Sequence, residues 1–157
     1  MTIPARKKEE ASPSYVARFD PERVWSLKQV QDNITTQQAQ LVDARSPGRF
    51  EGREDEPRPG ILSGSIPGSL NVCWTDLYDK QTPREGESGG VVALLKNKEN
   101  LREVFEKAGV QLQGTIVTSC GSGVTAACLV LALTVLGHND TSIYDGSWLE
   151  WVSLVQR

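Results

Sequence analysis

A cysteine surrounded by glycines is the part of this sequence best suited to chemistry. Residues 115–119 (TIVTS) are rich in β-branched side chains and lead directly into Cys120, and an apolar run follows from residue 124. A strand that turns through glycines into a helix points several backbone N–H groups at one spot. Because helix N-termini lower cysteine pKa values, we predict that Cys120 is a thiolate nucleophile.

The residues after Cys120 fit the same role. The glycines let the backbone curl closely around the sulfur, and the hydroxyls of Ser122 and Thr125 offer hydrogen bonds to it. The predicted active-site loop consists of Gly121, Ser122, Gly123, Val124 and Thr125.

The cysteine and histidine counts exclude several other kinds of site. Three cysteines and a single histidine are too few for a disulfide scaffold or for a metal site built on several imidazoles, so we expect neither a metal nor a cofactor. Cys73 and Cys128 are interpreted as small core residues. An odd number of thiols cannot all pair within one chain, which favours a reducing compartment, either cytoplasm or mitochondrion.

Charge and hydropathy exclude two classes of partner. The chain has 17 basic and 20 acidic residues, a net charge of -3, which gives no reason to expect binding to nucleic acid or to an anionic membrane. The longest apolar run, residues 126–136, is too short to cross a bilayer, and residues 1–14 resemble no secretory signal.

The elements that position the cysteine follow an alternating pattern. We expect residues 1–20 to form a flexible lead-in and residues 21–157 to form one domain. Ser26 is a candidate cap for a helix that carries Val30 and Ile34 on one face. Strands are predicted at residues 40–44, 69–72, 115–119 and 142–144, and helices at residues 25–34, 97–108, 124–136 and from residue 147. This alternation predicts an α/β fold with a mostly parallel central sheet flanked by helices on both faces.

Two connections are long. Residues 45–67 are rich in Gly, Pro, Arg and Glu, and unstructured loops of this length in compact domains are usually functional or mobile. The second connection is predicted to run through a short turn at residues 74–78 and a polar, glycine-rich segment to Gly90.

Four motifs together resemble a known family. They are CGSGVTA (120–126), YDGSWLEW (144–151), GRF (48–50) and EPR (56–58). They closely resemble the carboxyl-terminal catalytic domain of 3-mercaptopyruvate sulfurtransferases in the rhodanese superfamily. The resemblance implies a rhodanese-like fold, and sulfur transfer from 3-mercaptopyruvate through a Cys120 persulfide to a thiol such as thioredoxin, or to cyanide, with release of pyruvate.

The resemblance also implies roles for individual residues. Arg49 and Arg58 would bind the carboxylate and keto group of the donor, and Ser122 would join a proton relay completed by a histidine and an aspartate of an amino-terminal rhodanese domain. That domain is therefore an implied partner. The single histidine of this chain, His138, is interpreted as structural. The family usually has histidine where this chain has Ser65.

Further positions are expected to support the site. Arg45 is interpreted as structural and Asp43 as an anchor of the long loop. In the YDGSWLEW motif, which packs beneath the active loop in the family, Asp145 and Ser147 are expected to bind backbone, and Trp148 and Trp151 to fill the core.

Three alternative functions remain to be weighed. A phosphatase needs an arginine after the cysteine loop, where this chain has Ala126, so we exclude it. A thiosulfate:cyanide sulfurtransferase is the nearest alternative, although such enzymes have basic side chains where this chain has Gly121, Ser122 and Gly123. The other alternative is a non-enzymatic persulfide carrier, which has no need of the arginine pair.

Overall fold

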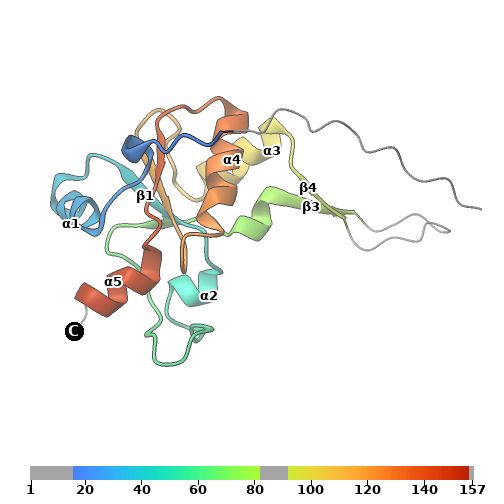
Figure 1. Ribbon diagram of the computed structural model, residues 1–157. Coiled ribbons are helices and arrows are strands. Elements are labelled where there is room, and N and C mark those ends of the chain that lie inside the picture. The colour runs from blue at the N-terminus through green and yellow to red at the C-terminus, as the bar shows by residue number, and fades with distance from the viewer. Residues whose placement is uncertain (1–15, 82–91, 156–157) are drawn as a thin grey trace, which may run out of the picture.

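A parallel sheet lies at the centre of the computed structural model, which describes residues 16–81 and 92–155 (Figure 1). Its strand order is β2-β1-β5-β6, with all neighbouring pairs parallel. The strands are β1 (Gln40–Asp43), β2 (Leu70–Asn71), β5 (Ile116–Ser119) and β6 (Thr141–Ile143). The predicted α/β class is confirmed, and the strand bounds differ from the expected ones by at most one residue at each end.

Helices cover both faces of this sheet. On one face, α3 (Lys98–Lys107) and α4 (Ala126–Leu136) pack a core that includes Phe105, Leu129 and Ile116. On the other face, α1 (Leu27–Thr36) and α5 (Ser147–Val155) pack a core that includes Val30, Trp148 and Val117. Ile116 and Val117 lie in different cores because successive side chains of a strand point to opposite faces.

Local signals explain where the helices begin and end. Ser26 caps α1 in a reciprocal arrangement with Gln29, and Gly137 ends α4 with a φ of 87°. Two details differ from expectation. Ile34 lies one helical turn after Val30 on the same side of α1, but it is 38% exposed, whereas Val30 is buried. Helix α4 begins at Ala126 instead of Val124, because the turn after Cys120 extends through Thr125.

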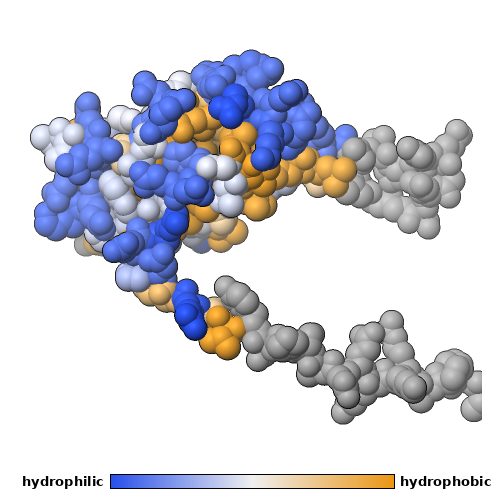
Figure 2. All heavy atoms as spheres, turned by 90° about the horizontal axis from the view of Figure 1, so that it is seen from above, coloured by the Kyte–Doolittle hydropathy of each residue, from blue (hydrophilic) through white to orange (hydrophobic). Residues whose placement is uncertain are grey.

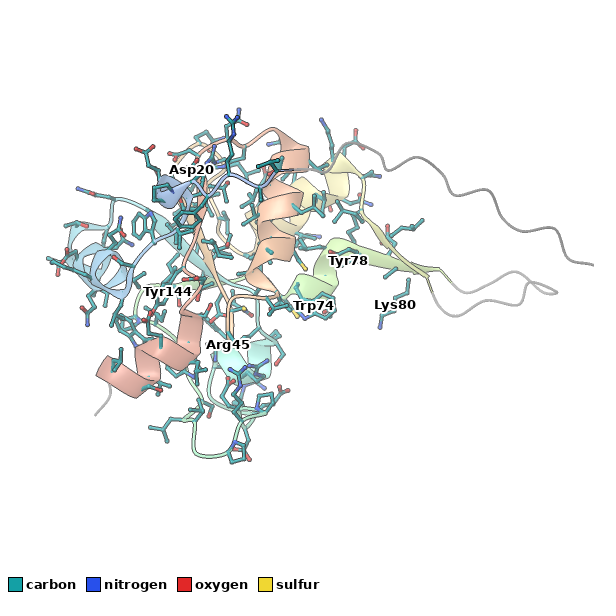
Figure 3. All side chains as sticks on the ribbon, in the orientation of Figure 1. Asp20, Arg45, Trp74, Tyr78, Lys80 and Tyr144 are labelled. Carbon is teal, nitrogen blue, oxygen red and sulfur yellow. The ribbon has the colours of Figure 1, made fainter. Side chains whose placement is uncertain are left out.

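The turn expected at residues 74–78 is present, but part of the connection after it forms a β-hairpin. The 3-10 turn η2 (Trp74–Leu77) is followed by β3 (Tyr78–Gln81), which pairs antiparallel with β4 (Val92–Leu95). The hairpin extends away from the central sheet (Figure 1), and at its base the rings of Trp74 and Tyr78 meet edge to face with centroids 6.1 Å apart (Figure 3). The sequence of β3, YDKQ, has a single apolar residue, so it showed no strand pattern. Residues 82–91 lie outside the described residues.

The domain boundary stays a prediction, because residues 1–15 also lie outside the described residues. The first described element is the 3-10 turn η1 (Pro21–Arg23). Within residues 16–81 and 92–155, no helix has the length and apolar character that crossing a membrane requires. Hydrophilic residues cover much of the face seen in Figure 2, and a band of hydrophobic residues interrupts them.

Candidate active site

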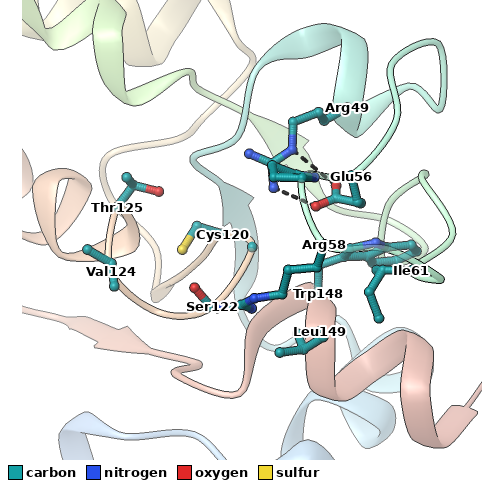
Figure 4. Close-up of a pocket in the computed structure, with 12 residues that line it drawn as sticks. Arg49, Glu56, Arg58, Ile61, Cys120, Ser122, Val124, Thr125, Trp148 and Leu149 are labelled. Atoms are coloured by element: carbon teal, nitrogen blue, oxygen red, sulfur yellow. Dashed lines mark hydrogen bonds and ion pairs between the residues drawn. The ribbon is translucent and has the colours of Figure 1, made fainter.

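Cys120 lies immediately after β5, where the chain turns into α4. Its side chain is 2% exposed, and its Sγ accepts a hydrogen bond of 3.1 Å from the Gly123 N–H. The sulfur borders a pocket of about 270 Å³ that is also lined by Arg49, Arg58 and Thr125 (Figure 4). Residues far apart in the sequence therefore meet around the predicted nucleophile.

Opposing effects act on the Cys120 thiol, and the net result favours the thiolate. Burial, the largest effect, raises the pKa of Cys120. The hydroxyl of Thr125 and the backbone N–H groups of Ser122, Ala126 and Thr125 lower it, and the resulting pKa is below that of an ordinary cysteine. The loop thus supplies the donors that a buried thiolate needs.

Replacing Thr125 by Val should raise the pKa of Cys120, because the Thr125 hydroxyl is the largest influence that lowers it. The rate of Cys120 alkylation by iodoacetamide, measured against pH, should rise through a midpoint at higher pH than in the unmodified protein. Thr125→Ser keeps the hydroxyl and should retain the original midpoint. An unchanged midpoint in Thr125→Val would show that the backbone donors suffice.

The segment that begins α5 supports the loop from below. Ser147 Oγ accepts a hydrogen bond of 3.1 Å from the Cys120 N–H and donates one of 2.9 Å to the Tyr144 carbonyl. The Trp148 N–H donates to the Cys120 carbonyl at 3.0 Å, and the Leu149 N–H to the Gly121 carbonyl at 3.1 Å. These contacts agree with the expectation that YDGSWLEW packs beneath the active loop.

Gly123 occupies a place where no other residue fits easily. Its φ is +88°, and a Cβ there would lie 2.8 Å from the Asp145 carbonyl oxygen. Asp145 therefore approaches the loop through its backbone. Among the described residues its carboxylate has no hydrogen-bond partner, unlike the role expected for it.

Arg49 reaches the loop from a short helix within the long connection. This helix, α2 (Pro47–Phe50), begins after Ser46, whose hydroxyl accepts a hydrogen bond from the Arg49 N–H. The Arg49 guanidinium lies against the loop, with Nη2 2.7 Å from where a Cβ on Gly121 would stand. The absence of a side chain at position 121 thus makes room for Arg49.

Arg45 is buried behind the pocket. Its guanidinium binds both carboxylate oxygens of Asp43, one oxygen of Glu56 and the Gly64 carbonyl, and its centre lies 4.9 Å from the centroid of the Trp148 ring. Burial lowers the pKa of Arg45, but hydrogen bonds and charge from Asp43 and Glu56 raise it, with a net increase. These contacts agree with a structural role for Arg45 and an anchoring role for Asp43.

Glu56 is the functional candidate that sequence reasoning missed. Its side chain is 5% exposed and accepts hydrogen bonds from both Arg45 and Arg49. Burial raises the pKa of Glu56, but the hydrogen bonds from Arg49 and Arg45 lower it overall, so the carboxylate stays charged. The EPR motif contains Glu56, yet Glu51, Glu54 and Asp55 nearby are exposed acids. Nothing local separates one from the others.

The remaining predicted residues surround the sulfur. Figure 4 shows Cys120 between Thr125 on one side and the arginines on the other, with the Arg58 side chain extended towards Ser122. Arg58 is exposed and forms no ion pair among residues 16–81 and 92–155. The pocket lining includes Arg49, Arg58, Cys120, Gly121, Ser122, Val124 and Thr125. Of the predicted site residues, Gly123 is the one outside this lining, and its backbone N–H donates to the Cys120 sulfur.

The other thiols and the imidazole lie outside this pocket. Cys73 is buried and Cys128 half-buried, whereas His138 contacts Thr141 Oγ1 at 2.8 Å and the Gly114 carbonyl at 2.9 Å. In the part of the chain that the structure describes, no group of His, Cys, Asp and Glu side chains is suited to a metal ion.

Comparison with known proteins decides the family. The profile of the rhodanese-like domain matches residues 26–154. The chain belongs to the rhodanese-like domain family. This rhodanese-like domain is 35% identical over 151 residues to human 3-mercaptopyruvate sulfurtransferase, and 44% identical over 135 residues to the protein of that name from Escherichia coli K12.

Solved structures agree with the fold. SseA from Escherichia coli, whose crystal structure was reported for the rhodanese fold of 3-mercaptopyruvate sulfotransferases, is 40% identical to this chain in sequence. The two structures match with a TM-score of 0.64, and the match covers 86% of this chain and 45% of SseA. The sequence matches cover 96% and 86% of this rhodanese-like domain but 47% and 44% of the human and bacterial relatives. The chain thus spans about half the length of the curated relatives it matches.

Proposed function

We propose that this rhodanese-like domain is a sulfurtransferase that moves sulfane sulfur from 3-mercaptopyruvate to a thiol acceptor through a persulfide on Cys120. The observation that supports this proposal is the arrangement around one pocket. A buried thiol with a lowered pKa faces two arginines that come from a separate loop. A donor with a carboxylate at one end and sulfur at the other fits this arrangement, with its carboxylate at the arginines and its sulfur at Cys120.

The first step transfers sulfur to the enzyme. The Cys120 thiolate attacks the sulfur of 3-mercaptopyruvate, a sulfur–sulfur bond forms, and the sulfur–carbon bond breaks with its electron pair going to the pyruvate enolate. The Gly123 N–H, 3.1 Å from Sγ, stabilises the sulfur charge. Protonation of the enolate gives pyruvate, and Cys120 is left as the persulfide.

The second step transfers the sulfur to an acceptor and regenerates the Cys120 thiolate. The thiolate of an acceptor, such as thioredoxin or a small thiol, attacks the outer sulfur, and Cys120 leaves as a thiolate stabilised by the same loop donors. Ser122 lines the pocket and is proposed to pass a proton to the enolate, together with groups from an amino-terminal rhodanese domain. The cytoplasm or the mitochondrion, where thiol acceptors stay reduced, is the proposed compartment.

The charge of the pocket favours a donor with one negative charge. Arg49 is already paired with Glu56, so Arg58 is the cation that remains available in the described pocket lining. With Cys120 as a thiolate, a dianion such as thiosulfate enters against greater repulsion than a monocarboxylate does. Thiosulfate is still the second candidate donor, because a matching Arabidopsis relative, 39% identical over 140 residues, is named a thiosulfate/3-mercaptopyruvate sulfurtransferase.

The proposal is tested by incubating the purified protein with each donor and measuring the mass of the modified protein. Incubation with 3-mercaptopyruvate should add one sulfur to Cys120, seen by mass spectrometry of its peptide, and pyruvate should appear in equal amount. Thiosulfate should react more slowly. Faster transfer from thiosulfate would replace the proposed donor, whereas sulfur passed only from a protein partner would favour the carrier alternative.

Arg58→Ala should chiefly weaken binding of the donor, because Arg58 is the exposed cation facing Ser122 in the pocket (Figure 4). Loss of a charge-assisted hydrogen bond of about 1.5–3 kcal/mol predicts a rise in KM for 3-mercaptopyruvate of about tenfold or more, with a smaller change in kcat. Arg53→Ala removes an exposed arginine that is not among the pocket residues, and should leave KM unchanged. A fall in kcat at constant KM would contradict a binding role for Arg58.

A further inference from the structure

Resting on the proposed function, we propose that Glu56 is a specificity-determining residue, which neutralises Arg49 and thereby sets the preference of the pocket for monoanionic over dianionic sulfur donors. This role concerns a carboxylate that contacts no sulfur atom. It acts through the net charge that the pocket presents to the donor.

The geometry commits both oxygens of Glu56 to arginine. Oε1 accepts from Arg45 Nη1 at 2.7 Å and from Arg49 Nε at 3.2 Å, and Oε2 accepts from Arg49 Nη2 at 2.5 Å. The Glu56 side chain is 5% exposed and that of Arg49 is 24% exposed. Solvent therefore screens this pair weakly, and the two charges act on the pocket together.

The negative charge of Glu56 neutralises Arg49 and not Arg45. Arg45 is fully buried and already bound by both oxygens of Asp43, so this first pair is neutral without Glu56. The second pair, Glu56 and Arg49, is neutral as well. Among the described residues that line the pocket, Arg58 is then the positive charge left to meet the donor.

The same geometry leaves Arg49 with hydrogen bonds to offer but little net charge. Its guanidinium has five N–H donors, of which Glu56 takes two. Arg49 can therefore orient a carboxylate or keto oxygen beside Gly121 without adding attraction for a second negative charge. Removing the charge of Glu56 would expose the full charge of Arg49 to whatever binds.

The size of the effect follows from Coulomb's law. An added unit charge on the order of 8 Å from the donor, at an effective dielectric constant of about 40, changes the relative binding of a dianion and a monoanion by about five- to tenfold. This factor should appear in the ratio of rates for two donors, where any general loss of activity cancels.

The first test compares donors in Glu56→Gln, which keeps the shape and one oxygen acceptor but removes the charge. The ratio of kcat/KM for thiosulfate to kcat/KM for 3-mercaptopyruvate should rise about five- to tenfold. Asp55→Asn is the matched control, since it makes the same charge change at an exposed neighbouring residue that does not line the pocket. Glu56→Asp keeps the charge and should keep the original ratio.

A second test does not depend on sulfur transfer. Iodoacetate is an anion and iodoacetamide is neutral, and both alkylate the Cys120 thiolate, so the ratio of their rates at one pH reports the charge near the sulfur. Mass spectrometry of the Cys120 peptide separates this reaction from those of Cys73 and Cys128. Glu56→Gln should raise the iodoacetate-to-iodoacetamide ratio about fivefold, and Asp55→Asn should not.

The outcomes separate this inference from the proposed function. An unchanged alkylation ratio in Glu56→Gln, in protein whose urea unfolding midpoint shows it to be folded, overturns the role of Glu56. Should the alkylation ratio rise while the unmodified protein takes sulfur from neither donor, the proposed function fails and the charge role stands. Equal losses with both donors and no change in alkylation would leave Glu56 with a structural role alone, which also overturns the inference.

Discussion

Replacing Cys120 by Ser abolishes sulfur transfer and leaves the fold intact, if Cys120 is the sulfur acceptor as proposed. A serine hydroxyl stays protonated in the cradle that lowers the cysteine pKa, and an alcohol cannot hold sulfane sulfur as a persulfide. The rate of transfer from 3-mercaptopyruvate should fall by a factor on the order of 10³ or more. The measurement is pyruvate release, combined with mass spectrometry of the peptide that contains residue 120.

Cys128→Ser is the control for this substitution. Cys128 is half-buried on α4 and does not line the pocket, so its replacement should retain transfer. The urea unfolding midpoint of Cys120→Ser should stay close to the original, because serine is slightly smaller and its oxygen can accept the Gly123 hydrogen bond. Sulfur transfer that persisted in Cys120→Ser would refute the nucleophile assignment.

Trp148→Ala should cause the largest loss of stability among single substitutions near the site. Trp148 lies on α5, is 1% exposed, packs in the core with Val30 and Val117, and donates from Nε1 to the Leu62 carbonyl at 2.7 Å. Truncating a buried tryptophan costs about 3–5 kcal/mol, and here it also uncovers Arg45. The free energy of unfolding, measured in urea, should fall by that amount, or the protein should fail to fold.

Trp148→Phe separates packing from hydrogen bonding. Phenylalanine keeps an aromatic ring but lacks the indole N–H, which leaves the Leu62 carbonyl without this donor. The expected loss is about 1–3 kcal/mol, clearly less than for alanine. Equal losses in both variants would mean that the hydrogen bond, and not the buried ring, dominates the stabilisation.

Much of the fold was predictable because its signals are local. The β-branched run before Cys120, the Ser26 cap and the glycine at the end of α4 each act within a few residues, and together they predict alternating strands and helices. The hairpin was missed because the four residues of β3 show no apolar alternation. Its pairing with β4 depends on residues that lie more than ten positions away in the sequence.

The site divides in the same way. The loop around Cys120 could be read from the chain, since a strand, a cysteine and a glycine turn place backbone N–H groups at the sulfur by local geometry alone. The arginines were found through motifs whose resemblance to a family is specific. The ion pairs of these arginines could not be predicted, because Arg49 meets Glu56 across a folded loop and Arg45 meets Asp43 in the interior.

The amino-acid sequence was therefore sufficient to predict the class of fold, to propose Cys120 as the nucleophile and to find most of the predicted site residues that line the pocket. Folding in three dimensions decided which of several acidic residues on one loop is buried, and so which arginine keeps a free charge in the pocket. The physical reason is that a thiolate loop is built from neighbours, whereas the electrostatic balance of a pocket depends on burial and distances between segments that only the packed structure brings together.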